Sequence, residues 1–328
     1  MFSSNTSFEE WALHWLKVHK MGLVKDITYD LSYRNPVERY LIPHFGKRPL
    51  VAITPGDIQT FFKGLTDKLA LESQKKILNA LRQIFEVAID YGICRTTPII
   101  RRLKLTSNIK PVEKQSWSFE EYKTAFKFAL NHPHGLEIIT LMETAISRSE
   151  LLGLEWSSLI RATRTLRLTD GLVSQRSTFT GQYELAHDGL KNQYRYRELP
   201  LSPLLFGLLS LKPRTIIVRG RTVAPKYIFH APQGGPFDPN NRYKRVLLPF
   251  MVDLHEVHPD VKLLTTHELR HTRATLLNNK GVSLLSIARL LGHADLNMLA
   301  KRYAHNDLDA LRQAIGIDEL YDQYLDVV

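Results

Sequence analysis

The feature that most constrains the fold is a loss of helical periodicity between Thr96 and Gln115. The stretch TTPIIRRLKLTSNIKPVEKQ is basic and punctuated by prolines, which is typical of a linker. Regular apolar spacing stands on both sides of it. A chain of 328 residues is also long enough for about two domains. The sequence therefore predicts a first domain over residues 1–100, a linker over 101–115 and a second domain over 116–328.

The first domain is predicted to be a small bundle of four helices. Ser7 with Glu10 forms a capping box, and Trp11 and Trp15 follow at the spacing of a buried helix face. A second helix is predicted over residues 29–40, before the helix breakers Pro43 and Gly46. A third begins at ITPGDIQTFFKGL, and a fourth follows Ser73 with one continuous apolar stripe.

The second domain is predicted to mix helices with a small antiparallel sheet. Its first helix begins at Ser118, where SFEE repeats the capping box, and helices continue to about Leu159. Alternation then predicts strands in RTLRLTD, NQYRYRELPL and KYIFH, and helix returns from about Arg242. The predicted fold class is α+β, mainly α.

Composition narrows the kind of partner. Lys and Arg number 44 against 33 Asp and Glu, a formal net charge of +11, which favours a nucleic acid although a merely basic protein has the same charge. The sequence has neither a bilayer-length apolar run nor a signal peptide, so we expect a soluble intracellular protein without a membrane partner. The single cysteine, Cys94, excludes an internal disulfide and a cysteine-rich zinc site.

The segment HELRH, from His267 to His271, fits either a metal or a phosphate. It matches the H-E-x-x-H pattern of zinc peptidases. Such a site needs a third ligand, yet no glutamate occurs between Glu268 and Glu319, and only Asp295 or His293 could serve. Zinc is therefore a distant alternative, and we expect neither a metal nor a cofactor.

The phosphate interpretation uses more of the segment. Arg270 lies one helical turn after His267, and a guanidinium can bind two phosphate oxygens. Thr265 and Glu268 form a capping box, so His267 falls in the first turn, where the helix dipole favours an anion. His293 follows the helix stop at Gly292, and Tyr303 comes ten residues later.

These motifs together resemble the tyrosine recombinase, or phage integrase, family. The matching segments are HELRHTRAT, LLGH ending at His293 and RYAH containing Tyr303. Upstream, SRSELLGLEW resembles the first arginine box, and LKNQYRYRELPL resembles the hairpin that carries a lysine, here Lys191. The resemblance covers nearly the whole chain. It implies a helical core-binding domain followed by a mixed α/β catalytic domain with a C-terminal exchange segment.

The resemblance also implies a chemistry and a role for each residue. Tyr303 would attack a scissile DNA phosphate, giving a 3′-phosphotyrosine link without ATP or metal. Arg270 and an upstream arginine, Arg148, would bind the nonbridging oxygens. His293 would donate to the same phosphate, His267 would manage the tyrosine proton, and Lys191 would protonate the leaving oxygen.

The partners implied by the resemblance are double-stranded DNA and further copies of the chain. Recombination needs a homo-tetramer on two DNA sites, with a C-terminal helix docked on a neighbour, and accessory DNA-bending or excision proteins can assist. The reaction would integrate or excise a mobile element. We expect a bacterial or phage-encoded protein of the cytoplasm, associated with the nucleoid.

Three features depart from the family pattern. Ser147 stands where the first arginine is expected, and Arg148 is one residue away, a rotation of about 100° on a helix. Ser147 with Glu150 also forms a capping box, which puts Arg148 in the first turn of a helix. The interval from His293 to Tyr303 is one residue longer than expected. The sequence before Ser7 is too short for the arm-binding domain of many phage integrases, so we expect either a truncated chain or relatives that lack this domain. Either Arg148 replaces the arginine, or the chain is a DNA-binding protein with impaired catalysis.

Overall fold

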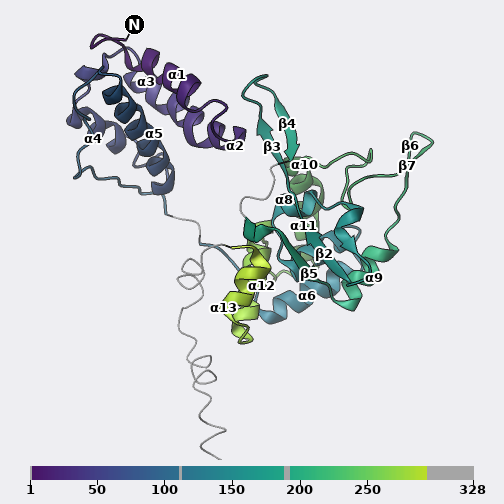
Figure 1. Ribbon diagram of the computed structural model, residues 1–328. Helices are drawn as coiled ribbons and strands as arrows, with labels where there is room; N and C mark the ends of the chain where they lie inside the picture. The colour runs from purple at the N-terminus through teal and green to yellow at the C-terminus, as the bar shows by residue number, and fades with distance from the viewer. Residues whose placement is uncertain (1, 111–112, 188–192, 294–328) are drawn as a thin grey trace, which may run out of the picture. The chain divides into compact units, whose positions relative to one another are not determined.

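Figure 1 shows the computed structural model, which describes residues 2–110, 113–187 and 193–293. The chain divides into two compact units, residues 1–113 with 175–184 and residues 114–174 with 185–328. Each unit has its own apolar core. None of the described helices is both long and apolar enough to span a membrane.

The first unit is built mainly from helices. They are α1 (Phe8–His19), α2 (Asp26–Thr28), the π-helical segments η1 (Tyr29–Arg34) and η2 (Val37–Leu41), α3 (Ile42–Phe45), the 3₁₀ turn η3 (Leu50–Ala52), α4 (Pro55–Lys63) and α5 (Leu71–Asp90). Trp11 and Trp15 are fully buried, and the Trp11 indole N–H donates to the carbonyl oxygen of Ile84 at 3.0 Å. The prediction that both tryptophans are core residues is confirmed.

Two predicted helix boundaries in this unit are wrong. The second helix was expected to end before Pro43, but helical structure continues through α3 to Phe45. Pro43 lies in the first turn of α3, directly after η2, and a proline is tolerated in a first turn. The fourth helix begins at Leu71 rather than after Ser73, and its N-cap residue, Ala70, makes no side-chain cap. The predicted start of α4 at Thr54 and Pro55 is confirmed, with a complete capping box.

The second unit begins with three helices, and most of its later part is helical as well. The first are α6 (Phe119–Leu130), α7 (Gly135–Thr144) and α8 (Arg148–Leu152), and the 3₁₀ turn η4 (Trp156–Ser158) follows. Later come α9 (Pro203–Leu211), α10 (Pro239–Arg242), η6 (Tyr243–Leu247), α11 (Leu248–Val257), α12 (Thr266–Asn279) and α13 (Leu284–Leu291). The predicted capping box at Ser118 is present at the start of α6.

Short antiparallel strands complete the second unit. β1 (Leu159–Ile160), β2 (Thr165–Leu168) and β5 (Arg197–Pro200) form one sheet in the order β1-β2-β5, with the buried Leu166 opposite Leu199. The pairs β3 (Leu172–Arg176) with β4 (Tyr183–His187) and β6 (Ile216–Val218) with β7 (Arg221–Val223) were not predicted. The predicted class, α+β and mainly α with a small antiparallel sheet, is confirmed (Figure 1).

Two predicted strands need correction. In NQYRYRELPL only Arg197–Pro200 is a strand, because the described residues before it form the 3₁₀ turn η5 (Gln193–Arg195). The segment KYIFH makes only isolated bridges, Glu155 with Tyr227 and His230 with Pro236. Prolines at 225 and 232 stand on both sides of KYIFH, and a proline has no N–H to extend a ladder.

Candidate active site

Two capped helix starts, those of α8 and α12, provide the framework of the site. The Ser147 N–H donates to Glu150 Oε2 at 2.7 Å, and the Glu150 N–H donates to Ser147 Oγ at 3.4 Å. At α12, the N–H of Thr265 donates to Glu268 Oε2 at 2.8 Å, and the Glu268 N–H donates back to Thr265 Oγ1 at 3.3 Å. Both capping boxes were predicted, and both are confirmed. They fix Arg148 and His267 in the first turns of their helices.

The starts of these two helices line one cleft. It has a volume of about 370 Å³, and its lining consists of Ser147, Arg148, Tyr243, Thr265, Thr266, His267 and Arg270. The structure thus brings together three of the predicted site residues, Arg148, His267 and Arg270. Arg148 and His267 are exposed, whereas Arg270 is 6% exposed. Within the described part of the chain, the Arg148 guanidinium makes no hydrogen bond or ion pair, so its donors face solvent.

Arg270 is held rigidly by backbone oxygens. Its Nη1 donates to the carbonyl oxygen of Ala145 at 2.8 Å, and its Nη2 donates to that of Leu291. Ala145 has a left-handed backbone conformation, with φ of 52°, at the end of α7. This turn directs the Ala145 carbonyl to Arg270. A guanidinium fixed in this way needs little reorganisation when an anion binds.

A buried carboxylate, Glu150, forms ion pairs with Arg197 and Arg270. Glu150 is 0% exposed, and its Oε1 accepts a hydrogen bond from Arg197 Nη1 at 2.8 Å. Its Oε2 lies 3.6 Å from Arg270 Nη1. Burial alone would raise the pKa of Glu150, but the hydrogen bond and charge of Arg197, the charge of Arg270 and the Ser147 N–H lower it to about 2. Glu150 is therefore ionised at neutral pH.

The pairing of Glu150 with Arg197 was not predicted, because Arg197 lies in LKNQYRYRELPL, the segment assigned to the hairpin that carries the catalytic lysine. Arg197 is instead structural, because its side chain is 8% exposed and its Nε also donates to the Leu290 carbonyl oxygen at 2.9 Å. A glutamate inside the apolar run SELLGLEW was the available signal for a buried ion pair.

The remaining predicted residues are not in this cleft. His293 follows Gly292, which ends α13 in the left-handed conformation with φ of 65°, as the sequence predicted. His293 lines a separate groove of about 800 Å³, whose other lining residues include Leu199, Leu285 and Leu290. The bond from Arg270 to the Leu291 carbonyl connects the end of α13 with the cleft. Lys191 and Tyr303 lie outside the described residues.

The environment of His267 is unfavourable for a metal. Its Nε2 lies 3.0 Å from the ammonium nitrogen of Lys114, and a cation at that distance opposes a second, metal cation. Among residues 2–110, 113–187 and 193–293, no group of three or more His, Cys, Asp or Glu side chains has the geometry of a metal site.

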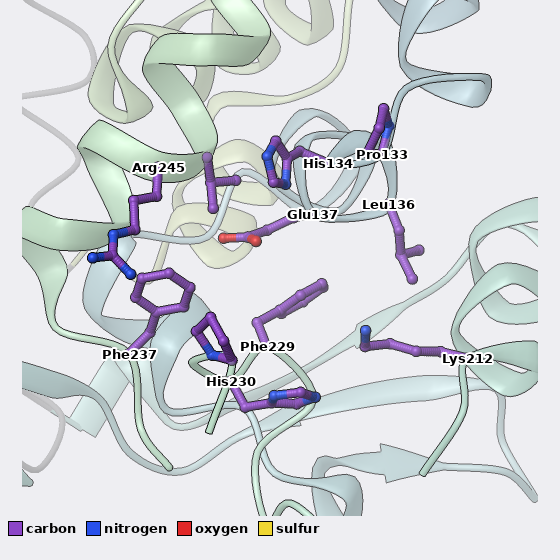
Figure 2. Close-up of a pocket in the computed structure, with 11 residues that line it drawn as sticks. Pro133, His134, Leu136, Glu137, Lys212, Phe229, His230, Phe237 and Arg245 are labelled. Atoms are coloured by element: carbon purple, nitrogen blue, oxygen red, sulfur yellow. The ribbon is translucent and has the colours of Figure 1, made fainter. Parts of the chain in front are cut away.

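A second cavity in this unit is lined by an acidic residue as well as by basic ones. Figure 2 shows the side chain of Glu137 between Lys212 and Arg245 in a cavity of about 310 Å³. Glu137 forms an ion pair with the fully buried Arg242, and burial lowers the pKa of Lys212. None of the predicted site residues lines this cavity, so the cleft at Arg148, His267 and Arg270 remains the candidate site.

Comparison with known proteins identifies the family. A model of the phage integrase family matches residues 118–309, and a model of the phage integrase central domain matches residues 8–104. The chain belongs to the phage integrase family. Its members include the tyrosine recombinases, so this chain is an enzyme that breaks and rejoins DNA.

Two relatives illustrate the similarity of this phage integrase family member to curated proteins. A tyrosine recombinase XerC from Bacillus licheniformis is 36% identical over 316 residues, covering 92% of this chain and 92% of the relative. A XerC-like tyrosine recombinase from Caldanaerobacter subterraneus is 24% identical over 302 residues, covering 85% and 73%.

Solved integrase structures share the fold. The Tn1549 transposon integrase in complex with transposon right end DNA has a TM-score of 0.73 at 21% identity, covering 95% of this chain and 99% of that one. A lambda integrase tetramer bound to a Holliday junction has a TM-score of 0.60 at 18% identity, covering 89% and 75%.

Proposed function

We propose that this phage integrase family member cuts and rejoins duplex DNA at a specific site through a covalent link to Tyr303. The observation that carries the proposal is the single cleft that unites Arg148, His267 and Arg270 at the start of α12. Two cationic side chains and an imidazole beside a helix N-terminus suit one phosphodiester anion.

The step proposed at this cleft conserves the phosphodiester. The Tyr303 Oη forms a bond to phosphorus, the bond from phosphorus to the 5′-oxygen breaks, and the DNA keeps a 3′-phosphotyrosine end. The phenol loses its proton to His267, and the leaving 5′-oxygen takes a proton from Lys191. Attack by the 5′-hydroxyl of a second strand reverses these events and joins the new partners.

Charge development in this step explains the residue types. The transition state gathers extra negative charge on the nonbridging oxygens, and fixed donors stabilise it most when they need no rearrangement. Arg270, held by the carbonyls of Ala145 and Leu291, is such a donor. Arg148 brings the second guanidinium, and His293 would donate a further hydrogen bond to the phosphate.

The proposed partners are two DNA duplexes and three further copies of the chain. Related integrases are described as bound to transposon end DNA and, for lambda integrase, as a tetramer on a Holliday junction. We assign residues 1–100 to core-site binding, 101–115 to the linker and 116–328 to catalysis and exchange. The protein would act in the cytoplasm, at the nucleoid, with accessory DNA-bending or excision proteins where its element encodes them.

One observation bears on how fast this enzyme cleaves DNA. Ser147 occupies the position expected for an arginine, and its N–H and Oγ cap helix α8. If Arg148 does not reach the phosphate, the cleft retains a single catalytic arginine and cleavage is slow.

Covalent capture tests the proposal directly. The protein is incubated with a pool of duplexes of randomised sequence, each nicked so that cleavage releases a short 5′-hydroxyl fragment, and bound DNA is recovered under denaturing conditions and sequenced. We expect one enriched site, and capture that persists in EDTA. Tyr303→Phe should bind the enriched site without forming an adduct. An adduct with Tyr303→Phe, or activity lost in EDTA and restored by zinc, would contradict the assignment.

A further inference from the structure

The last residues before α6 are fixed along α12 by hydrogen bonds. The N–H of Gln115 donates to Glu268 Oε1 at 3.1 Å, and the N–H of Trp117 donates to Thr272 Oγ1 at 3.1 Å. The Trp117 ring is 1% exposed, and its Nε1 donates to the Lys262 carbonyl oxygen at 2.8 Å. This segment, residues 114–117, therefore has a defined position on the catalytic unit.

The first residue of this segment, Lys114, lies at the candidate active site. Its Nζ is 3.0 Å from Nε2 of His267, a residue that lines the cleft. An ammonium group has no acceptor, so it is the donor in this contact and His267 Nε2 is the acceptor. The contact places a third positive charge beside Arg148 and Arg270.

The charge balance of the cleft leaves room for this lysine. Arg270 shares the buried carboxylate of Glu150 with Arg197, so part of its charge is already matched. The position expected to supply the first arginine is Ser147, which is uncharged. The ammonium of Lys114 can therefore supply a positive charge that the expected arginine at position 147 would otherwise have supplied to a phosphate next to His267.

The acid next to His267 in sequence, Glu268, is engaged in hydrogen bonds with Thr265 and Gln115. Burial alone would raise the pKa of Glu268, but hydrogen bonds from Thr265 and from the Gln115 N–H hold it below its usual value. Its carboxylate oxygens accept from these backbone groups at 2.8 and 3.1 Å, and Glu268 does not line the cleft. The ammonium of Lys114 is thus directed to His267.

We infer that Lys114 is a further active-site residue, whose ammonium donates to the scissile phosphate when DNA occupies the cleft. Its ammonium donates to His267 Nε2 in the structure, and the phosphate of bound DNA would be the acceptor instead. This inference rests on the proposed function, because it names an additional residue of the same site. The competing role is purely structural, a lysine that only fastens the linker to α12.

Cleavage kinetics separate the two roles. On the captured nicked duplex, with protein in excess, Lys114→Ala should slow adduct formation by about 10²-fold, the scale for losing one donor to a developing oxyanion. Lys114→Arg should restore much of the rate, since it keeps the charge. The matched control is Lys110→Ala, which removes an exposed lysine of the linker, residues 101–115, and should cleave like the parent. DNA affinity should not fall further in Lys114→Ala than in Lys110→Ala.

A neutral phosphate tests the contact itself. With a methylphosphonate at the scissile position, the nonbridging charge is removed, and the rate ratio between the parent and Lys114→Ala should fall from about 10² to near 1. A structural lysine would give the same ratio on both substrates. Parent-rate cleavage by Lys114→Ala, or a ratio unchanged by the methylphosphonate, would overturn the inference.

A measurement without DNA distinguishes failure of the inference from failure of the proposed function. Tungstate, a tetrahedral dianion, should bind the full-length protein in calorimetric titrations at low salt. Lys114→Ala should bind it about tenfold more weakly, the scale of one hydrogen bond to a charged group, whereas Lys110→Ala should match the parent. Equal tungstate affinity in Lys114→Ala, or no binding by the parent, would contradict the role of Lys114 even if DNA is cleaved. Weakened tungstate binding without any DNA adduct would instead support Lys114 and contradict the recombinase chemistry.

Discussion

Replacing Glu150 with glutamine should destabilise the catalytic unit strongly. The carboxylate is 0% exposed and is paired with Arg197 and Arg270. Its pKa is lowered from 4.5 to about 2, which corresponds to about 3 kcal/mol in favour of the ionised form. Removing one partner of a buried ion pair costs about 3–5 kcal/mol, because the other charge stays buried. We therefore expect Glu150→Gln to lower the free energy of unfolding by about 3 kcal/mol at pH 7.

The pH dependence of this loss has a definite sign. A folded-state pKa below the unfolded value contributes stability at pH above about 4.5, and this contribution disappears as the pH falls toward 2. The difference between the parent and Glu150→Gln should thus shrink by about 1 kcal/mol between pH 7 and pH 3.5.

Urea unfolding followed by hydrogen exchange and mass spectrometry measures this difference. Peptides from α8 and β5 report on the catalytic unit, and peptides from α5 report on the other unit as an internal control. Glu198→Gln is the matched variant, because Glu198 is an exposed carboxylate next to Arg197 in sequence and its ion pair with Arg167 is open to solvent, so it should unfold close to the parent. A loss below about 1 kcal/mol in Glu150→Gln, or a loss independent of pH, would refute the argument that the buried carboxylate holds the arginines.

Three further predictions concern DNA. Arg148→Ala should slow adduct formation by roughly 10²–10³ while site binding stays near the parent value, and Ser147→Arg should not raise the adduct yield. Cleavage by Arg148→Ala at the parent rate, or a higher yield with Ser147→Arg, would favour a DNA-binding protein with impaired catalysis. The logarithm of the DNA association constant should fall with the logarithm of salt concentration, with a slope of about −0.9 per contacted phosphate. Separate fragments 1–100 and 113–328 should each bind DNA more weakly than the whole chain, and full affinity in the second fragment would contradict DNA binding by both domains. Truncation after Asn306 should spare DNA binding in gel shifts and reduce the assembly of paired sites; unchanged assembly would exclude exchange of the C-terminal segment.

Local interactions in the molecule could be predicted from the sequence. The caps at Ser118, Ser147 and Thr265 each join residues three apart, so the pattern itself contains both partners. The burial of Trp11 and Trp15 follows in the same way from helical spacing.

Interactions between distant residues could not be predicted. The bond between Glu150 and Arg197 joins residues 47 apart, and nothing in either local pattern indicates the partner. The segment KYIFH has the composition of a strand, but pairing depends on a neighbour with free N–H and carbonyl groups in register. Lys114 was missed because its segment has the composition of a linker, whereas its anchoring depends on α12.

The carbonyl oxygens at the end of α13 accept hydrogen bonds from arginines of two other elements, that of Leu290 from Arg197 and that of Leu291 from Arg270. Both arginines converge on one carboxylate, so none of the three positions can change alone without leaving a buried charge or helix carbonyl unsatisfied. In distant relatives we therefore expect Glu150, Arg197 and Arg270 to be inherited or replaced as a set. Covariation among these three positions, in an alignment deep enough to detect it, would indicate chains that keep the same buried ion pairs next to the phosphate site.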